Sequence, residues 1–546
     1  MSASPDVLVV GAGPVGLGLA LQAADHGAAV RVVERRTERF RPSRALMVHA
    51  RTLEVLRPLG VTDALLDRAD TAPRARLHLG SRTVPVELAA LELPDTAFPH
   101  LSLVRQMDVE AVLEAALAAR GIEVEWGREL RGVGHGADDA EAVLAGPAGP
   151  ERIHAAALAG CDGVDSTVRT SAGIGWRGGT YDREIVLADV DLDGALEPGA
   201  AHVAVGRSGL VFVFALGERA PWRLLATRPC SAATPSPGRP GPPLPLRELQ
   251  HLLDVAGLGA QMTRVAWSST IRLQHRMATT YRSGRLFVVG DAAHASSPAG
   301  GQGMNVGLQD AANLGWKLAL APGSTAAQSL LDSYDLERRP ADEDVLALTH
   351  LLFWAESSTG RLAALLRGRV APWAAPLLPF LLGRRRLVAE VMRLLARLDV
   401  GYRGSPVSMA DDAPRRRGPR PGDRLPDATV TSAGREVRLH ALTARPGVHL
   451  LLDRDAPAPA CRNALVHVHR VESWPGTGVL ALRPDGHVGY TAARARDEAL
   501  TVWLRRVGLP SDARDALHEA GSPGWPPRRI EGDAVGSGPS GPMSPH

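Results

Sequence analysis

Two glycine-rich turns, each between an apolar strand pattern and a helix pattern, restrict the folds open to this chain. The first lies in VLVVGAGPVGLGLALQAADHGAAVRVVERR, starting at Val7, and the second in RLFVVGDAAHASSPAGGQGMNVGLQDAANLGWKLA, starting at Arg285. A strand that turns directly into a helix is typical of parallel α/β sheets. We therefore expect an α/β fold in which two distant segments supply similar turns.

The first turn has the spacing of a dinucleotide-binding loop. The fingerprint G-x-G-x-x-G runs over Gly11, Gly13, Pro14, Val15 and Gly16. In such loops the first glycine makes the turn, the second admits a pyrophosphate and the third lets the helix approach the sheet. Glu34 ends the next strand, near the 20-residue spacing at which a carboxylate binds a ribose hydroxyl. The alternative is a turn without a ligand, with Glu34 a surface acid.

The second turn places a carboxylate, Asp291, at a strand end and follows it with four glycines before a helix begins. A tight turn needs one or two glycines, so this number suggests a ligand close to the backbone. The loop from Pro298 to Asn305 ends at a helix N-terminus, which favours negative charge such as that of a reduced flavin. A flat ring stacked on backbone would explain the missing side chains; close packing is the alternative.

Composition limits the class of protein. A chain of 546 residues with 45% hydrophobic content is expected to form several soluble domains. The net charge is +3, and no clustered basic stripe predicts nucleic-acid binding. Three cysteines lie far apart and predict neither disulfides nor a metal site. The N-terminus lacks a signal-peptide pattern, and the apolar stretch from Val370 is broken by prolines, so we expect a cytoplasmic protein without a membrane span.

Pattern changes along the chain predict its organisation. We expect a Rossmann-like first domain over residues 1–177, with 78–100 contributing to a substrate domain, and its second part over 276–345. An inserted antiparallel sheet over 178–275 would form the substrate domain, with a Pro/Gly-rich loop from Ser231 that is expected to be mobile. A helical region would cover 346–410, a linker would start at Asp411, a C-terminal domain would extend over 411–509, and 510–546 would be a disordered tail.

These motifs resemble those of single-component FAD aromatic hydroxylases with the p-hydroxybenzoate hydroxylase fold. Besides the two turns, CDGVDSTVR from Cys161 and DSYDLERRP from Asp332 match the family over roughly the first 345 residues. RALMVHARTLEVL and the C-terminal RPDGHV are most similar to actinobacterial aromatic polyketide hydroxylases and phenylpropionate-type hydroxylases. The resemblance implies a C-terminal thioredoxin-like domain lacking redox cysteines, and Cys461 stands alone there.

The resemblance also implies roles for individual residues around FAD. The adenosine half would be bound by Glu34, Arg35 and the backbone of Leu130. The pyrophosphate and ribityl region would involve Arg44, Gln106, Asp162, Gly163 and Arg169. The flavin half would be bound by Asp291 at the ribityl chain, Pro298 near the reactive edge, and the backbone of Gly301, Gly303, Met304 and Asn305.

Candidates for substrate contact lie in the inserted sheet, where aromatic side chains are also typical of core. We expect Phe212, Phe214 and Trp222 to line the pocket, and Tyr181 and His202 lie in the same domain. We name no catalytic side chain, because the chemistry would be centred on the flavin. His294, just past a strand end, is more typical of a hydrogen-bonded structural residue than of a catalytic base.

The implied reaction is hydroxylation of an aromatic substrate, polyketide or phenolic, by O2 and NADH or NADPH through a flavin C4a-hydroperoxide. Baeyer–Villiger oxygen insertion and a flavin-binding protein without turnover stay open. A flavin halogenase is disfavoured, because the W-x-W-x-I-P motif is absent and the one lysine, Lys317, lies on the flavin-loop helix. The sequence does not decide the substrate, the position oxidised, the choice of nicotinamide, or between monomer and dimer.

Overall fold

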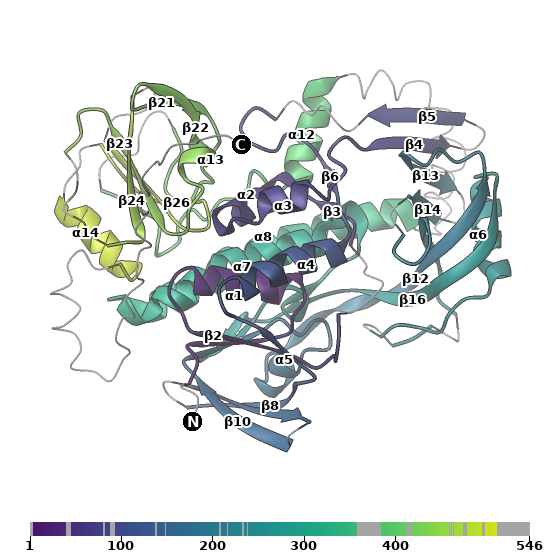
Figure 1. Ribbon diagram of the computed structural model, residues 1–546, viewed down its shortest axis with the longest axis horizontal. Helices are drawn as coiled ribbons and strands as arrows, with labels where there is room; N and C mark the ends of the chain where they lie inside the picture. The colour runs from purple at the N-terminus through teal and green to yellow at the C-terminus, as the bar shows by residue number, and fades with distance from the viewer. Residues whose placement is uncertain are drawn as a thin grey trace, which may run out of the picture.

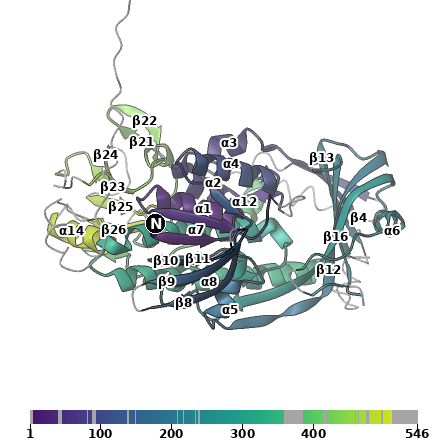
Figure 2. The ribbon, with the colours of Figure 1, turned by 60° about the horizontal axis from the view of Figure 1, so that its bottom comes forward.

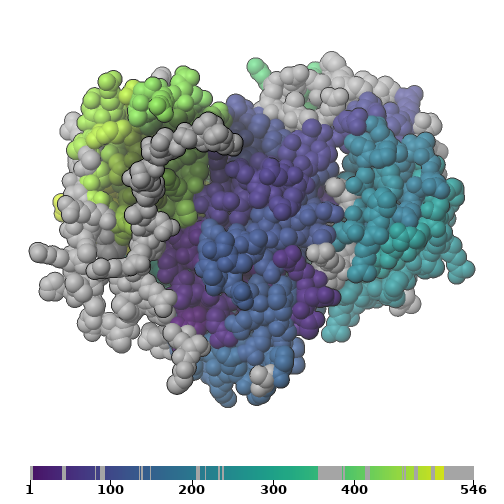
Figure 3. Space-filling model, viewed as in Figure 1, coloured from purple at the N-terminus to yellow at the C-terminus, as the bar shows by residue number. Residues whose placement is uncertain are grey.

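The computed structural model contains three units joined in one chain (Figure 1). The structure describes residues 4–39, 45–79, 82–87, 93–136, 139–147, 149–206, 209–215, 217–231, 234–236, 239–357, 384–411, 418–457, 459, 461, 463–472, 478–493 and 497–509. We call the three parts the N-terminal unit, the inserted sheet and the C-terminal unit. They lie at the centre, right and left of Figure 3 respectively.

The N-terminal unit is built on a six-stranded sheet in the order β17-β18-β11-β1-β2-β7. Its strands are β1 (Val7–Val10), β2 (Val30–Glu34), β7 (Val124–Trp126), β11 (Ala157–Gly160), β17 (Arg282–Ser283) and β18 (Leu286–Val288). All neighbours pair parallel except β17 with β18. Strands such as VLVV are buried throughout, as expected of a parallel sheet covered on both faces.

Helices and a small sheet cover this core. α1 (Pro14–Ala24) packs on β1 and β2 and against α4 (Gln106–Ala118) and α7 (Gln302–Leu320). α5 (Thr167–Ser171) contacts β11, β18 and β8. A three-stranded sheet of β8 (Glu129–His135), β9 (Ala140–Gly146) and β10 (Gly149–Ala155) lies beside them (Figures 1 and 2). This is the α/β arrangement expected from the two glycine-rich turns.

The inserted sheet has eight strands in the order β19-β16-β12-β15-β14-β13-β4-β5. They are β4 (Arg74–Leu79), β5 (Arg82–Glu87), β12 (Trp176–Gly194), β13 (Ala200–Gly206), β14 (Gly209–Phe214), β15 (Trp222–Pro229), β16 (Ala260–Ala278) and β19 (His294–Ala295). Pairing is antiparallel except between β13 and β4. The boundaries expected near residues 177 and 275 fall inside β12 and β16, because each strand runs continuously from one unit into the other (Figure 1).

One face of the inserted sheet is covered by α6 (Leu246–Ala256), whose Leu249 and Leu253 are fully buried. The C-terminal part of the Pro/Gly-rich loop is bonded to β16, since the Gly241 N–H donates to the Thr270 carbonyl (2.8 Å) and the Leu244 N–H to Ser268 Oγ (2.7 Å). This half of the loop is therefore attached to the sheet edge.

Long helices follow the second glycine-rich turn. α8 (Ala327–Ser357) is one continuous helix, so the boundary expected at residue 345 lies within it. α12 (Arg385–Leu395) follows, and the proline-broken apolar stretch between them lies outside the described residues. Within the described ranges, every helix is too short or too polar to cross a membrane.

The C-terminal unit is a five-stranded sheet in the order β20-β26-β25-β23-β24. Its strands are β20 (Met409–Ala410), β23 (Val448–Asp453), β24 (Val466–Val471), β25 (Val479–Leu482) and β26 (Val488–Ala492), with α13 (Leu439–Leu442) and α14 (Asp497–Arg506). β23 and β24 pair parallel while β25 and β26 form an antiparallel hairpin, which is the pairing expected of a thioredoxin-like unit. The expected tail, 510–546, lies outside the described residues.

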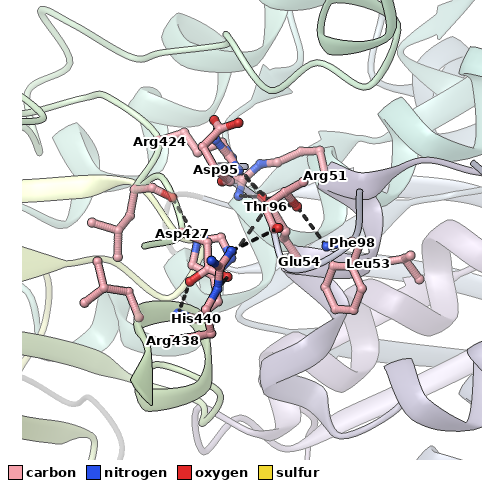
Figure 4. Close-up of polar contacts among 12 residues, drawn as sticks. Arg51, Leu53, Glu54, Asp95, Thr96, Phe98, Arg424, Asp427, Arg438 and His440 are labelled. Carbon is pink, nitrogen blue, oxygen red and sulfur yellow. Dashed lines mark hydrogen bonds and ion pairs between the residues drawn. The ribbon is translucent and has the colours of Figure 1, made fainter. Parts of the chain in front are cut away.

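The segment after Asp411 is not a free linker over its whole length. Arg424 is 6% exposed and ion-paired with Glu54 of α2 (Ala50–Leu56) at 2.6 Å and with Asp95 at 3.0 Å (Figure 4). The Asp427 N–H donates to the Asp95 carbonyl at 2.8 Å. Composition predicted a linker here, but buried ion pairs fix its C-terminal half to the N-terminal unit; Arg415–Arg417 lie outside the described residues.

Candidate functional site

Four of the sequence motifs meet at one edge of the parallel sheet. β18, β11, β1 and β2 are successive neighbours and run in the same direction. Their carboxyl ends lead into Gly290–Asp291, Cys161–Gly163, Gly11–Gly13 and Glu34 respectively. In open α/β sheets, ligands bind outside the carboxyl ends of the strands. The topology therefore brings together segments that are far apart in the sequence.

Two different physical reasons account for the glycines of the first turn. A Cβ on Gly11 would lie 2.4 Å from the Cys161 carbonyl oxygen, and one on Gly16 would lie 1.9 Å from the Gly11 carbonyl oxygen. Packing inside the protein therefore requires both glycines. A Cβ on Gly13 would meet nothing within 4 Å, although Gly13 is extended and could accommodate a side chain. Internal packing does not explain this glycine, and the space beside it is open to a ligand.

The glycines of the second turn are explained only in part by a ligand. Gly300 and Gly301 have φ of 71° and 63°, a left-handed turn that disfavours other residues. A Cβ on Gly307 would lie 2.6 Å from Val15 Cγ2, so Gly307 lets α7 approach α1. Of the two glycines that the resemblance places at the flavin, Gly301 and Gly303, only Gly303 has neither a clash nor a left-handed backbone to explain it.

Asp291 and Gly303 face each other across this open position. A Cβ on Gly303 would have Asp291 Oδ1 as its nearest neighbour, at 4.0 Å. Asp291 is exposed and sits in a short 3-10 turn, Gly290–Ala292, directly after β18. The N-cap of α7 is Gly301, which has no side chain to cap the helix. The first N–H groups of α7, which no side chain caps, and the Asp291 carboxylate therefore border the same open position.

Glu34 lies over the first turn. Its Oε2 accepts the Ala12 N–H at 2.9 Å, and its Oε1 accepts from Arg36 Nε at 2.9 Å. Burial alone would raise the pKa of Glu34, but these hydrogen bonds lower it below its usual value. The charged carboxylate stands where the resemblance places a ribose. Arg35 is exposed beside it, and Leu130 is buried in the core with its backbone at a β-bulge in β8.

Gln106 begins α4 at the border of a segment that the structure does not describe. Its Oε1 accepts the Ala45 N–H at 3.2 Å, and its Nε2 donates to Glu110 at 2.8 Å. Arg44, expected at the pyrophosphate, lies outside the described residues.

Asp162 and Gly163 shape the turn after β11. Asp162 Oδ2 accepts the N–H groups of Thr167 (2.7 Å) and Val168 (3.2 Å), so it caps α5. Its Oδ1 is buried without a hydrogen-bond partner among the described residues, and burial raises the pKa of the carboxyl. Gly163 has a left-handed φ of 79°. A buried polar atom without a partner is unusual and fits a ligand at this turn.

Arg169 is a structural link in addition to any cofactor role. Its Nη1 donates to the Ala292 carbonyl at 2.9 Å and its Nη2 to the Val164 carbonyl at 2.7 Å. The guanidinium carbon lies 3.9 Å from the centroid of the Trp176 ring. Arg169 therefore joins the Asp162 turn to the Asp291 turn.

Asn305 fixes the start of α7. Its Oδ1 accepts the His49 N–H at 2.9 Å, and its Nδ2 donates to the carbonyls of Met47 (3.0 Å) and Gly301 (2.7 Å). The side chain is thus used inside the protein, which leaves only backbone for a cofactor, as the resemblance implies. Met304 is partly buried beside it, and Pro298 is exposed in the loop before α7.

His294 belongs to a buried ionic cluster. Its Nε2 lies 2.7 Å from Asp310 Oδ2 and 3.5 Å from Asp342 Oδ2, and the residue is 3% exposed. Burial lowers the pKa of His294, but Asp342 and Asp310 outweigh it and raise the pKa to about 9. Arg338 is paired with both acids, at 2.6 and 2.7 Å. The histidine is therefore a charged structural residue rather than an available base.

His294, Asp310 and Asp342 lie close enough together to bind a metal ion by distance alone. Their carboxylate oxygens are already used, since Asp310 accepts from Arg338, His294 and the Gly290 N–H, and Asp342 from Arg338 and Tyr281. The Arg338 guanidinium therefore already satisfies one oxygen of each carboxylate.

The predicted substrate residues lie on two faces of the inserted sheet. Phe212 pairs with Leu225, and Leu225 with Leu187, so these three side chains share a face. Leu187 packs with Ala299 of the second glycine-rich loop. Phe214 shares this face and stacks on Phe212 with ring centroids 5.7 Å apart. Phe212 and Phe214 are thus on the side of the cofactor loop.

Trp222 is on the other face, and its assignment to the same pocket was wrong. Trp222 is three residues from Leu225 along β15, an odd number, so the two side chains point to opposite faces of the sheet. Trp222 packs with Leu249 and Leu253 of α6. His202 contacts the Trp222 ring on that side. The side chains of a strand alternate between its two faces, but no sequence pattern shows which of the two faces α6 covers.

A cluster of aromatic and histidine side chains lies on the same face of the inserted sheet as Phe212, and sequence patterns did not predict it. Tyr181 lies at a register shift between β12 and β16, and its hydroxyl is 3.0 Å from His350 Nδ1 of α8. The rings of His275 and Phe353 lie 4.8 and 4.7 Å from the Tyr181 ring. His275 Nδ1 is buried without a partner in the described structure. β-Bulges often redirect side chains at functional sites, but a bulge carries no clear sequence signal.

Comparison with known proteins identifies a family. Residues 4–349 match the family model described as an FAD binding domain. The chain is 33% identical to 6-methylpretetramide 4-monooxygenase of Streptomyces rimosus, over 95% of this chain and 97% of that protein.

Two solved structures are similar over almost the whole chain. A ternary complex of aklavinone-11 hydroxylase with FAD and aklavinone is 26% identical, covers 93% of this chain and 99% of its own, and gives a TM-score of 0.73. A Diels-Alderase from the biosynthetic pathway of pyrroindomycins is 28% identical, covers 92% and 99%, and gives a TM-score of 0.70.

Proposed function

The chain belongs to the FAD-binding-domain family of flavin-dependent monooxygenases, and from this premise we propose that it hydroxylates a polycyclic aromatic, polyketide-type substrate with NAD(P)H and O2. The observation that carries the cofactor assignment is the pair of open glycine positions, Gly13 and Gly303, at two adjacent helix N-termini. FAD, once reduced, would activate O2 for transfer of one oxygen atom. The protein itself would bind and orient FAD and the substrate.

Residues of the N-terminal unit would bind and orient the cofactor. Glu34 would exchange part of its present hydrogen bonding for a ribose hydroxyl, and Gly13 would let the pyrophosphate reach the N–H groups of α1. Asp291 would accept from the ribityl chain. The N–H groups that begin α7 would stabilise negative charge on the reduced ring, as a preorganised set of donors does without reorganising.

The face of the inserted sheet that packs against the second glycine-rich loop is evidence for an aromatic substrate. Phe212, Leu225 and Leu187 offer an apolar surface, and Arg223 on the same face is paired with Asp189 and fully buried. Apolar and aromatic walls suit stacked rings, and the absence of water there would protect the reactive flavin. Tyr181 and His275 are polar groups at one end of this face that could contact a phenolic hydroxyl.

A cleft that adjoins the residues expected at FAD supports the use of a nicotinamide nucleotide. Arg35, Arg169 and Arg239 line it, together with Asp165, Thr170 and Pro240, where the N-terminal unit meets the Pro/Gly-rich loop. Arg35 and Arg239 are exposed and suit the phosphates of NADH or NADPH, because arginine binds phosphate bidentately, whereas Arg169 is already bonded to two carbonyls.

The proposal is tested by following NAD(P)H oxidation in the FAD-loaded protein. We expect slow oxidation alone and several-fold faster oxidation with an anthracycline or tetracycline precursor, with a product heavier by one oxygen atom. Oxidation that no aromatic compound stimulates would contradict the substrate class. FAD binding without any oxidation of NADH or NADPH would instead favour a flavin-binding protein without turnover. Insertion of oxygen into a ring ketone would identify Baeyer–Villiger chemistry.

A further inference from the structure

The C-terminal unit has no role in the chemistry proposed above. Its one cysteine, Cys461, excludes a redox dithiol within the unit. It is nevertheless joined to the N-terminal unit by charged side chains that are almost completely buried. Such groups are costly to bury unless each is paired, so their arrangement indicates a specific connection.

The first connection is made by the turn between β25 and β26. Arg483 forms a two-pronged ion pair with Glu337 of α8, at 2.6 and 2.7 Å. Glu337 also accepts from Lys317 of α7 at 2.7 Å, and Asp485 accepts from Asn313 of α7 at 3.1 Å. The hairpin of the C-terminal unit therefore holds α7 and α8 together.

The second connection reaches the cofactor loop itself. Arg338, next to Glu337 on α8, donates from Nη1 to the Tyr402 hydroxyl at 3.0 Å and from Nε to Asp310 Oδ1 at 2.6 Å. Asp310 Oδ2 accepts the N–H of Gly290 at 3.2 Å. Three hydrogen bonds thus connect Tyr402 with the residue before Asp291.

Tyr402 is attached to the C-terminal unit. Its ring lies 4.1 Å, between centroids, from the His487 ring in the β25–β26 turn, and its N–H donates to the Gly422 carbonyl at 2.6 Å. At the other end, Gly290 has a left-handed φ of 60°, and its N–H bond to Asp310 fixes this turn. The direction in which Asp291 is presented therefore depends on the position of Asp310.

We propose that the C-terminal unit is a positioning element for the flavin loop, and that Tyr402, Arg338 and Asp310 are the positioning residues. The inference rests on FAD binding at Asp291 and deepens the proposed function. The docked C-terminal unit fixes the position of Arg338 through the Tyr402 hydroxyl. Arg338 in turn fixes Asp310, and Asp310 fixes the Gly290 turn through the Gly290 N–H group. Coupling of this kind is reciprocal, so FAD binding also stabilises the docked C-terminal unit.

The mutational test measures the affinity of the full-length apoprotein for FAD by fluorescence titration. Tyr402→Phe is expected to weaken FAD binding roughly threefold to tenfold, the effect of one hydrogen bond to a charged group. Asp310→Asn cuts the connection nearer the flavin, so adding Tyr402→Phe to it should cause little further loss. Tyr490→Phe is the matched control, because its buried ring packs on Trp503 of α14 in the same unit. Equal effects of Tyr402→Phe and Tyr490→Phe, or additive losses in the double variant, would overturn the inference.

A measurement on the unmodified protein covers the case in which a variant does not fold. Hydrogen–deuterium exchange with and without saturating FAD should show slower exchange around residues 290–305 and also around Tyr402 and Arg483–His487. Slower exchange in the first region alone would reject coupling to the C-terminal unit while leaving the FAD assignment intact. Protein that takes up no FAD would reject the proposed function itself.

Discussion

Replacing Gly13 and Gly16 by alanine should separate ligand approach from internal packing, although the two glycines belong to one motif. Gly13 is extended, with φ −76° and ψ 178°, and a Cβ there meets nothing within 4 Å. Alanine fits this backbone, and it reduces the conformational entropy of the unfolded chain. Gly13→Ala should therefore leave the apoprotein unchanged or more stable, by about 0.4–1 kcal/mol. The added methyl group would stand where the pyrophosphate approaches, so FAD affinity should fall at least tenfold.

Gly16→Ala should behave in the opposite way. The new Cβ would lie 1.9 Å from the Gly11 carbonyl oxygen, a backbone atom that cannot move aside. We expect a loss of about 1–3 kcal/mol or more in the free energy of unfolding of the apoprotein, the cost of overpacking. Urea unfolding of both apoproteins and FAD titration of each give the comparison. If Gly13→Ala bound FAD as tightly as the unmodified protein, the first turn would not hold the pyrophosphate.

Four further experiments test other residues of the proposed site and of the units around it. Asp291→Ala should weaken FAD binding by roughly 1.5–3 kcal/mol, the worth of a hydrogen bond to a charged group, and unaltered affinity would exclude its ribityl role. Cys461→Ser should leave NAD(P)H oxidation and hydroxylation unchanged, and a large loss of turnover with folding intact would restore a redox role. The pKa of His294 is raised to about 9, so its contribution to stability should be complete below pH 6.5 and be lost as the pH rises through 9. Unfolding measured from pH 6 to 10 should show this decline, and His294→Gln should lack it. The pKa of His487 is lowered to about 4 by burial and by Arg51, so its contribution should instead be lost as the pH falls from 6.5 toward 4; a flat acid profile would contradict the buried neutral ring.

The sequence predicted those parts of the site that depend on short-range rules. Gly11, Gly13 and Gly16 with Glu34 follow from strand–turn–helix spacing, and the second turn could be recognised from Asp291 and its glycines. The convergence of the four strand ends follows from parallel pairing once the α/β fold is accepted.

What the sequence could not supply depends on packing between distant segments. Gly307 and Gly303 look alike in sequence, yet one is required by Val15 of another helix and the other is not. Trp222 and Phe212 alternate correctly along their strands, but only the position of α6 decides which face is covered. Arg424 sits in a stretch of linker composition, and its partners Glu54 and Asp95 are more than 300 residues away.

The origin of the oxygen atom added to the product decides whether this protein acts as a monooxygenase. The FAD-loaded protein would be supplied with NADPH, an aromatic polyketide substrate and ¹⁸O-labelled molecular oxygen in ordinary water, and the product would be analysed by mass spectrometry. A monooxygenase incorporates one labelled atom per molecule of product. A product whose new oxygen comes from water would contradict the account.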